Sequence, residues 1–451
     1  MHTPLLTRGK MGPTLLRFAL PFLLSSVLQA LYGAADLFVV GQFTGSAAVS
    51  AVSIGSQVMQ TLTGIILGFS MGGTVLIGQC VGAQDGERTA VAVGNMAVAF
   101  ALLAALLTPA MLLLTRPAAH LMQTPAEALS DTERYLWVCA CGLPFIIGYN
   151  AVSGIFRGLG DSKTPVVFVA IACVLNIVLD FGLVGGLHLG ALGAALATVL
   201  SQAASFSLAL LYMLRRGFSF AISRRHFRLE RTACRRIFKV GAPLALQDGL
   251  VNLSFLLITA IINTMGLIAS ASVGVVEKLM AFAFLPPGAF SSAVATVTAQ
   301  NIGANQPQRA YQGLWYGVGF SLLSGVAICL YAQFFPQTLT RIFSNDPAVV
   351  AQASQYMRSY AIDCILVSLV FCMNAYFSGC GRSMVSLLHS LAATFLVRVP
   401  LSYGLSRLPG ISLYAIGFAA PAATLLSVFI CLWYLGHLRR QAARGLPTGF
   451  P

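Results

Sequence analysis

Residues 79–90 read QCVGAQDGERTA, and residues 300–311 read QNIGANQPQRAY. The two segments share Gln, Gly, Ala and Arg at the same positions, so that Arg88 aligns with Arg309 and the offset in numbering is 221. A motif that returns at a fixed separation is the sequence signature of an internal duplication.

The same offset appears elsewhere in the chain. It relates GLGDS at 158–162 to GCGRS at 379–383, and Gly45 to Gly266. Two prolines in apolar segments, at positions 21 and 243, differ from this offset by only one position. We therefore predict that the chain consists of two copies of one structural unit.

The composition identifies the class of protein that is duplicated. Of 451 residues, 57% are hydrophobic and 9% are charged, whereas soluble domains carry about 25% charged residues. Apolar runs of about 20 residues, enough to cross a bilayer as a helix, recur along the chain. We predict twelve spans, at 14–40, 47–76, 88–113, 133–155, 165–186, 189–213, 238–264, 269–298, 311–335, 350–376, 384–404 and 411–436.

Twelve spans and one duplication give six helices in each copy. Because six is even, both copies enter the membrane from the same side, as in transporters built from parallel repeats. We predict an all-α membrane protein with an N-terminal lobe at 1–214, a basic linker at 215–237 and a C-terminal lobe at 238–451 with a short basic tail. In parallel-repeat transporters the substrate site lies between the halves.

The distribution of basic residues predicts the orientation. The net charge is +14, and 20 of the 27 Lys and Arg fall in segments that lie on one side if the N-terminus is inside, including Arg444 in the tail. The other side holds Arg116, Arg134, Arg341, Arg358, Arg398 and Arg407. By the positive-inside rule, both termini and segment 215–239 are expected in the cytoplasm of a plasma-membrane protein. The basic linker then lies near anionic lipid, and we expect no nucleic-acid partner.

Five acids fall inside the predicted spans: Asp36, Asp180, Asp248, Glu277 and Asp363. An ionised carboxylate at that depth costs several kcal/mol, so each is expected to face a cavity or a partner. None has an acid at the matching position of the other copy, where the residues are Leu257, Leu401, Val27, Ser56 and Gly142. The scaffold repeats but the charges do not, which favours a role in mechanism.

Asp36, Asn176, Asp180 and Thr198 are expected at a similar depth in the first lobe, with Asn176 and Asp180 on one face of a helix. These oxygen atoms could share a proton or bind Na⁺, with Asp36 and Asp180 as the principal ligands. The alternative is a buried polar network that only locks the helices together. Pro21, fifteen residues before Asp36, frees a backbone carbonyl and is a candidate hinge.

Other motifs add no catalytic or metal chemistry. The ten cysteines include no C-x-x-C pair and are expected to be packing residues. Gly158-Leu159-Gly160-Asp161 matches the short motif of intramembrane aspartyl proteases, but it sits in a basic turn and its repeat partner has Arg382 instead of the acid. No H-E-x-x-H or G-x-S-x-G signature is present. We therefore expect that the protein is not an enzyme and has no resident cofactor.

These motifs resemble the multidrug and toxic compound extrusion (MATE) family over all twelve predicted helices. The resemblance rests on Pro21, Asp36, Gly82-Ala83 with Arg88, Arg157 to Asp161, Asn176, Asp180, Thr198, Gln300 to Ala304, and Gly379 to Arg382. It implies two lobes that alternate access and expel cationic amphipathic compounds against H⁺ or Na⁺.

In that family, the N-terminal lobe carries a cation-responsive network that matches the Asp36 cluster, with Asn150 as a weaker member. Some members use an acidic pair in the C-terminal lobe. Asp363 fits one partner, but Asp248 and Glu277 do not match the expected position of the other. We expect a monomer acting on small cationic or amphipathic molecules and contacting lipid. The alternatives are a lipid-linked precursor flippase of related fold and, from another class, an integral-membrane enzyme.

Overall fold

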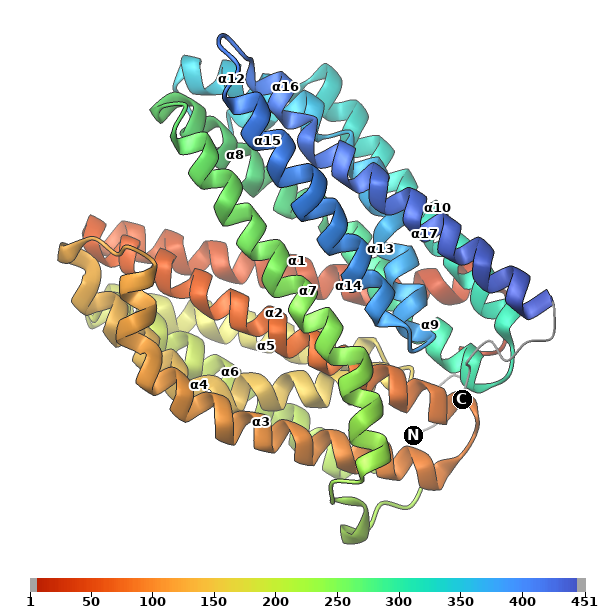
Figure 1. Ribbon diagram of the computed structural model, residues 1–451. Coiled ribbons are helices and arrows are strands. Elements are labelled where there is room, and N and C mark those ends of the chain that lie inside the picture. The colour runs from red at the N-terminus through yellow and green to blue at the C-terminus, as the bar shows by residue number, and fades with distance from the viewer. Residues whose placement is uncertain (1–5, 444–451) are drawn as a thin grey trace. The chain divides into compact units, whose positions relative to one another are not determined.

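The computed structural model describes residues 6–443, and every regular element within them is helical (Figure 1). The basic tail that includes Arg444 lies outside the described residues. The first half contains α1 (Met11–Phe43), α2 (Ser46–Gly82), α3 (Gly86–Leu121), α4 (Ala126–Gly158), α5 (Lys163–Asp180), the π-helical turn η1 (Phe181–Gly186) and α6 (Gly190–Arg216).

The second half follows a single turn of 3₁₀ helix, η2 (Arg224–His226). It contains α7 (Arg231–Asn263), α8 (Leu267–Ala283), α9 (Leu285–Gly303), α10 (Pro307–Phe334), α11 (Pro336–Thr340), α12 (Pro347–Tyr360), α13 (Asp363–Gly379), α14 (Ser383–Ala392), the π-helical turn η3 (Ala393–Arg398), α15 (Val399–Ser406), α16 (Leu413–Gly417) and α17 (Ala419–Ala443).

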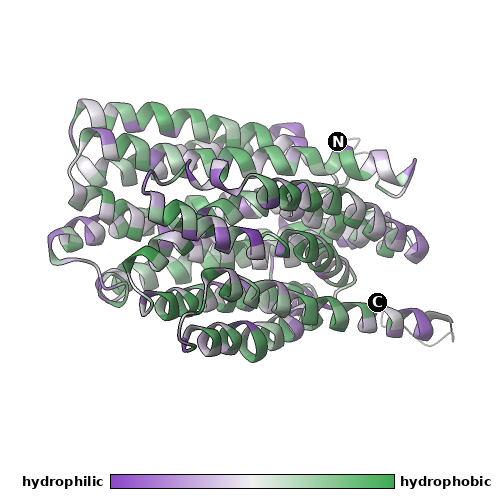
Figure 2. Cartoon of the chain, turned by 90° about the horizontal axis from the view of Figure 1, so that it is seen from above, coloured by the Kyte–Doolittle hydropathy of each residue, from purple (hydrophilic) through white to green (hydrophobic). Residues whose placement is uncertain are grey.

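Eleven helical segments of residues 6–443 are long and apolar enough to cross a membrane, and the pair α12 and α13, bent by 45°, makes a twelfth. The predicted twelve spans and the all-α fold are thereby confirmed. Figure 2 shows hydrophobic residues along the lengths of these helices. Large apolar side chains also point outward, among them Leu113, Leu396 and Trp433, each more than 70% exposed. Such a surface is suited to lipid rather than to water.

Helix α7 begins at Arg231, so residues 231–237 of the predicted linker segment are helical. The segment before it is held against α3. The backbone N–H of Glu230 donates to Asn95 Oδ1 at 2.8 Å, and His226 Nε2 lies 3.1 Å from Glu87 Oε1. A Cβ at Gly94 would lie 2.1 Å from the carbonyl oxygen of His226, so only glycine allows this approach.

Two compact units make up the described chain. Unit 1 contains Leu20–Ala245, and unit 2 contains Thr7–Ala19 and the residues from Leu246 onward. Two helices are therefore shared: the first turns of α1 belong to unit 2, and the first turns of α7 belong to unit 1. Each change of unit falls within three residues of a proline inside the helix, Pro21 or Pro243.

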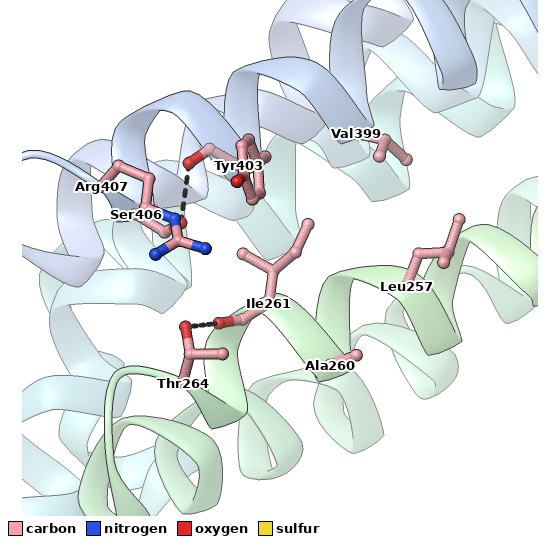
Figure 3. A pocket seen from close by; sticks show the side chains of 8 residues that line it. All are labelled: Leu257, Ala260, Ile261, Thr264, Val399, Tyr403, Ser406 and Arg407. Carbon is pink, nitrogen blue, oxygen red and sulfur yellow. Dashed lines mark hydrogen bonds between the residues drawn. The ribbon is translucent and has the colours of Figure 1, made fainter.

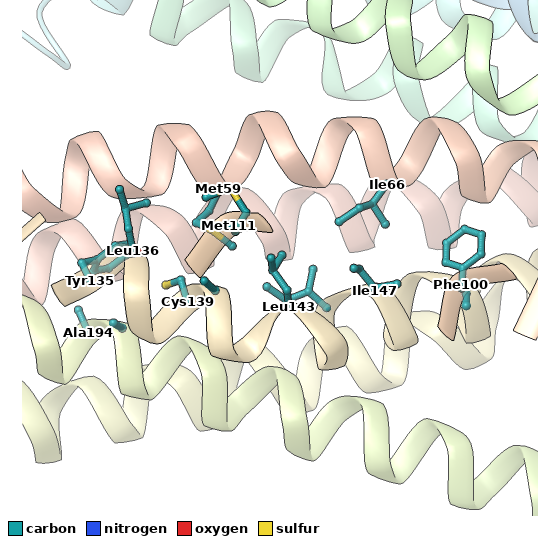
Figure 4. Close-up of a cluster of buried hydrophobic side chains, with 14 of the residues drawn as sticks. Met59, Ile66, Phe100, Met111, Tyr135, Leu136, Cys139, Leu143, Ile147 and Ala194 are labelled. Atoms are coloured by element: carbon teal, nitrogen blue, oxygen red, sulfur yellow. The ribbon is translucent and has the colours of Figure 1, made fainter. Parts of the chain in front are cut away.

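In unit 1, α4 packs against α2, α3 and α6, and α5 packs against α6. Buried apolar side chains of α2, α3 and α4 form its core (Figure 4), including Met59, Phe100, Leu143 and Ile147. The first part of α7 packs closely on α2 because a Cβ at Gly72 would lie 2.3 Å from the carbonyl oxygen of Ile237.

In unit 2, α9, α10 and α13 pack against one another, and α12 packs against α8 and α16. The first part of α1 is bound here. Gly12 of α1 packs on the ring of Tyr316, and Arg309 Nη1 donates to the carbonyl oxygen of Gly9 at 2.8 Å. Unit 2 thus contains the first turns of α1, and unit 1 contains the first part of α7, while the rest of each helix belongs to the other unit.

Candidate functional site

The predicted acidic cluster of the first lobe assembles within unit 1 from three helices. Asp36 of α1 lies within interaction range of Asp180 and Asn176 of α5 and of Thr198 of α6. The contact with hydrogen-bond geometry is made by Thr198, whose Oγ1 donates to Asp36 Oδ2 at 3.4 Å. Asn176 and Asp180 are fully buried, and Asp36 is 5% exposed. The four residues that we predicted to lie at one depth are therefore neighbours.

Most polar atoms of this cluster lack a protein partner. Among the described residues, both oxygens of Asp180, both polar side-chain atoms of Asn176 and Oδ1 of Asp36 make no hydrogen bond. Buried polar atoms are normally hydrogen-bonded, and leaving one unpaired costs about 1–3 kcal/mol. Five such atoms around two carboxyls indicate a place that a small species completes.

Local structure explains how the cluster forms. Asn176 and Asp180 are four residues apart in α5, so both point from the same face. The helix changes to π geometry directly after Asp180, which widens the turn on that side. The π-helical turn packs closely on α6, because a Cβ at Gly193 would lie 3.1 Å from the carbonyl oxygen of Leu183.

Tyr32 and Tyr135 also belong to this region, although sequence reasoning did not select them. Tyr32 is near Thr198 and Ser201, and Tyr135 is near Cys139 and Asp36. The Tyr32 hydroxyl is another buried oxygen without a partner among the described residues. Its position four residues before Asp36 on the same helix face was the available signal.

Asn150 is not joined to this cluster by any contact seen in the structure. Its Nδ2 donates to the carbonyl oxygen of Ile146 at 2.8 Å, and its own carbonyl oxygen accepts from Ser70 Oγ at 2.9 Å. These bonds connect α4 to itself and to α2. In this structure Asn150 therefore ties helices together beside the core.

The predicted acids of the second lobe have different surroundings. Glu277 of α8 and Asp363, the first residue of α13, both lie near the guanidinium of Arg398. Asp248 of α7 is exposed, and so is Lys278, the residue that follows Glu277. Arg398 was counted with the basic residues of the outer side, although the predicted span at 384–404 also includes it. It ends η3 inside the membrane-spanning helix Ser383–Ser406, because Pro400 at the start of α15 does not interrupt that helix.

A separate cavity of about 250 Å³ lies in unit 2 between α7 and α15 (Figure 3). Its lining is mostly apolar, with Leu257 and Ile261 on one side and Tyr403 on the other. The guanidinium of Arg407 lies 5.0 Å from the centre of the Tyr403 ring at one end. None of the predicted site residues lines this cavity.

The oxygen-rich cluster of unit 1 is suited to a proton or a hard monovalent cation. Its donors are two carboxyls, an amide and hydroxyls, which are the ligand types that hard cations take. No group of three or more His, Cys, Asp or Glu suited to a metal occurs within the described part of the chain. The cluster therefore remains the candidate site for a small cation that the sequence predicts.

Comparisons with known proteins agree on one family. The MatE family profile matches residues 21–181 and 243–404, once in each half of the duplication. A probable multidrug resistance protein, YoeA of Bacillus subtilis, is 27% identical over 442 residues, covering 96% of each chain. An FAD transporter of Shewanella oneidensis is 26% identical over 444 residues, again covering 96% of each chain.

Solved structures show the same fold. A MOP-superfamily transporter from Pyrococcus furiosus superposes with a TM-score of 0.91 at 21% identity, covering 98% of this chain and 99% of that one. The outward-facing conformation of a multidrug resistance MATE family transporter also gives a TM-score of 0.91 at 21% identity, over 99% of both chains. With the duplication, the twelve helices and the profile matches in both halves, the chain belongs to the MATE family of multidrug and toxic compound extrusion transporters.

Proposed function

We propose that this protein is a secondary active efflux transporter that exchanges cationic or amphipathic small molecules for H⁺ or Na⁺. The observation that carries the proposal is the buried pair Asp36 and Asp180, whose oxygens are largely unpartnered. No cationic side chain forms an ion pair with either acid in the described chain. A coupling cation would supply the missing charge.

This pair of acids is expected to have two electrostatic states, one without and one with a bound cation. Two carboxylates close together in a low-dielectric interior resist double ionisation, and the repulsion is relieved when a proton or Na⁺ binds. One charge moving through 100 mV supplies about 2.3 kcal/mol, so one or two ions can drive substantial accumulation of a substrate. Asn176 and Thr198 complete the site by offering an amide and a hydroxyl.

The shared helix α1 supplies the link from ion binding to conformational change. Asp36 lies in the part of α1 that belongs to unit 1, whereas residues before Leu20 belong to unit 2. Pro21, next to that change, removes a backbone hydrogen bond and permits bending. Cation binding at Asp36 would thus act on a helix that both units hold, with Pro21 as hinge and the drug displaced outward.

The orientation is part of the proposal. We place both termini and the basic linker in the cytoplasm of a plasma-membrane protein, because most Lys and Arg then lie inside. We also expect the protein to work as a monomer. A cysteine introduced near position 225 should resist a membrane-impermeant thiol reagent in intact cells. Labelling of that cysteine from outside would reverse the assigned topology.

The experiment that tests the function uses purified protein in liposomes with a fluorescent cationic dye. A pH gradient and a Na⁺ gradient are imposed separately, and each is collapsed with the matching ionophore as a control. Gradient-dependent dye accumulation that the ionophore abolishes is the expected result. Accumulation at the same rate without any gradient would contradict cation coupling.

One relative favours a second substrate class. The Shewanella oneidensis protein is an FAD transporter and matches this chain along nearly its whole length. The same liposomes can therefore be loaded with flavin adenine dinucleotide. Gradient-driven flavin transport that the cationic dye does not inhibit would replace the proposed cationic substrates by anionic dinucleotides.

A further inference from the structure

Arg398 is a basic residue inside a membrane-spanning helix of unit 2. It ends the π-helical turn η3 and is followed by the two turns of α15 within the span Ser383–Ser406. A basic side chain at such a position is costly unless it faces a cavity or is paired, and it usually marks function. The matching position of unit 1 in the repeat, beside Asn176, is the apolar Ile177.

Aromatic residues fix the position of the guanidinium. Arg398 Nη2 donates to the Tyr360 hydroxyl at 3.1 Å, and its Cζ lies 4.3 Å from the centre of the Phe255 ring. Stacking on an aromatic face is favourable for a desolvated guanidinium. Tyr360 is 1% exposed, so this anchor is rigid.

Two acids from other helices lie near this held cation. Asp363 follows Tyr360, the residue that accepts from Arg398, by three positions at the bend between α12 and α13, and Glu277 of α8 adjoins Val276, which packs in the same buried cluster as Tyr360. Neither forms a direct ion pair with the guanidinium within the described residues. Oε1 of Glu277 and Oδ1 of Asp363 are buried and make no hydrogen bond there.

We propose that the Arg398 guanidinium is a tethered counter-ion for Glu277 and Asp363 and takes the place of one exchangeable cation in the C-terminal lobe. The charge of Arg398 cannot leave, so it stabilises these acids in every step of transport. The exchangeable cation is then confined to the Asp36 and Asp180 pair, which has no such residue. This last step rests on the proposed function, whereas the counter-ion role does not.

The test measures cation-dependent stability in a protein whose first ion site is disabled. The parent variant is Asp36→Asn with Asp180→Asn, which keeps the side-chain shapes. To it are added Arg398→Met, which removes the charge at similar length, or Arg398→Lys, which keeps the charge. Melting temperatures are compared in NaCl and in choline chloride at equal ionic strength, over a series of pH values.

Removing the tethered charge should make the C-terminal lobe recruit a cation from solution. The Arg398→Met protein is expected to gain an upward shift of at least about 2 °C on adding Na⁺ or on lowering the pH, relative to the parent. Arg398→Lys should behave as the parent does. Adding Glu277→Gln and Asp363→Asn to Arg398→Met should abolish the gained response, because no charge then needs balancing.

Two results would overturn the proposal. One is an Arg398→Met protein that is stable and responds to neither Na⁺ nor pH more than the parent. The other is a failure of both Arg398→Met and its fully neutralised version to fold, which would make Arg398 a packing residue. Failure of Arg398→Met alone, with the neutralised version folded, supports a charge-balancing role. An error in the proposed coupling site would be detected separately, because the parent variant would then export dye at the normal rate.

Discussion

Two copies of one helical scaffold each carry a pair of acids, Asp36 and Asp180 in unit 1 and Glu277 and Asp363 in unit 2, and all but the half-buried Glu277 are buried. The first pair is near neutral groups such as Tyr32 and Thr198, and within residues 6–443 no cationic side chain forms an ion pair with it. The second pair lies near the guanidinium of Arg398, which Tyr360 and Phe255 hold in place. In our proposal, one lobe therefore has an open ion site, and the other carries a fixed positive charge.

This difference separates what the duplication preserves from what it does not. The glycines at 158 and 379 are equivalent, and each allows two helices to cross closely in its own unit. The acids have no equivalents in the other copy. Close helix packing is needed twice because there are two bundles, whereas a single coupling site is enough for exchange.

The shared glycines give the largest expected effect. A Cβ at Gly158 would lie 2.8 Å from Ile77 Cβ, and one at Gly379 would lie 2.7 Å from the carbonyl oxygen of Ala295. Gly158→Ala and Gly379→Ala should each lower the free energy of unfolding by about 1–3 kcal/mol through overpacking. Chemical denaturation in detergent measures this change in the free energy of unfolding. Gly274→Ala is the control, because no atom lies within 4 Å of its Cβ.

If Gly158→Ala destabilised the protein while Gly379→Ala did not, the scaffold would be less symmetric than the repeat implies. An equal loss of unfolding free energy in Gly158→Ala and Gly379→Ala, with no loss in Gly274→Ala, would support the symmetry of the scaffold. It would show that the two bundles use the same close contact.

A smaller effect is expected at Asn176. The matching residue of the second copy is Val397, so a helix of this scaffold accepts valine there. Asn176→Val should leave the fold intact but remove a ligand from the ion site, at a cost of about 1–2 kcal/mol. The cation concentration for half-maximal dye export should rise about ten-fold. An unchanged concentration dependence would remove Asn176 from the site, and Glu127→Gln at an exposed position serves as the control.

The smallest effect is expected at Thr198, whose counterpart in the second copy is Ala419. Thr198→Ala removes the hydroxyl that donates to Asp36 Oδ2 at 3.4 Å. A single hydrogen bond contributes about 0.5–1.5 kcal/mol, so the same half-maximal concentration should shift about 2–10-fold. Thr198→Ser should restore the original cation concentration for half-maximal dye export. A loss in Thr198→Ser equal to that in Thr198→Ala would point to the methyl group and packing instead.

Much of this architecture could be predicted from the sequence, because apolar length and a repeated separation are properties of the linear chain. The twelve spans follow from hydrophobicity, and the proximity of Asn176 and Asp180 follows from their helical spacing. The neighbourhood of Asp36 and Thr198 followed from estimated depth in the bilayer, a coordinate that membrane proteins share along all their helices.

Features that depend on helix geometry could not be predicted in this way. The predicted span at 384–404 already includes Arg398 and Pro400, but the count of charges assigned Arg398 to the outer side; the π-helical turn that ends at Arg398 could not be predicted from the sequence. The assignment of the first part of α1 to unit 2 and of the first part of α7 to unit 1 also depends on close contacts between segments that are distant in the sequence. Tyr32 was missed although its spacing of four residues from Asp36 places both on one helix face, because most aromatic residues of apolar helices only pack.

We propose that the Asp36 and Asp180 pair of unit 1 couples transport, and that the Glu277 and Asp363 pair beside Arg398 in unit 2 does not. The most direct measurement compares gradient-driven dye export by Asp36→Asn, Asp180→Asn and Asp363→Asn in the same liposomes, with dye binding measured alongside. We predict that Asp36→Asn and Asp180→Asn still bind dye but lose gradient-driven export, while Asp363→Asn retains it. Normal export by both unit 1 variants, together with its loss in Asp363→Asn, would instead place coupling in the C-terminal lobe.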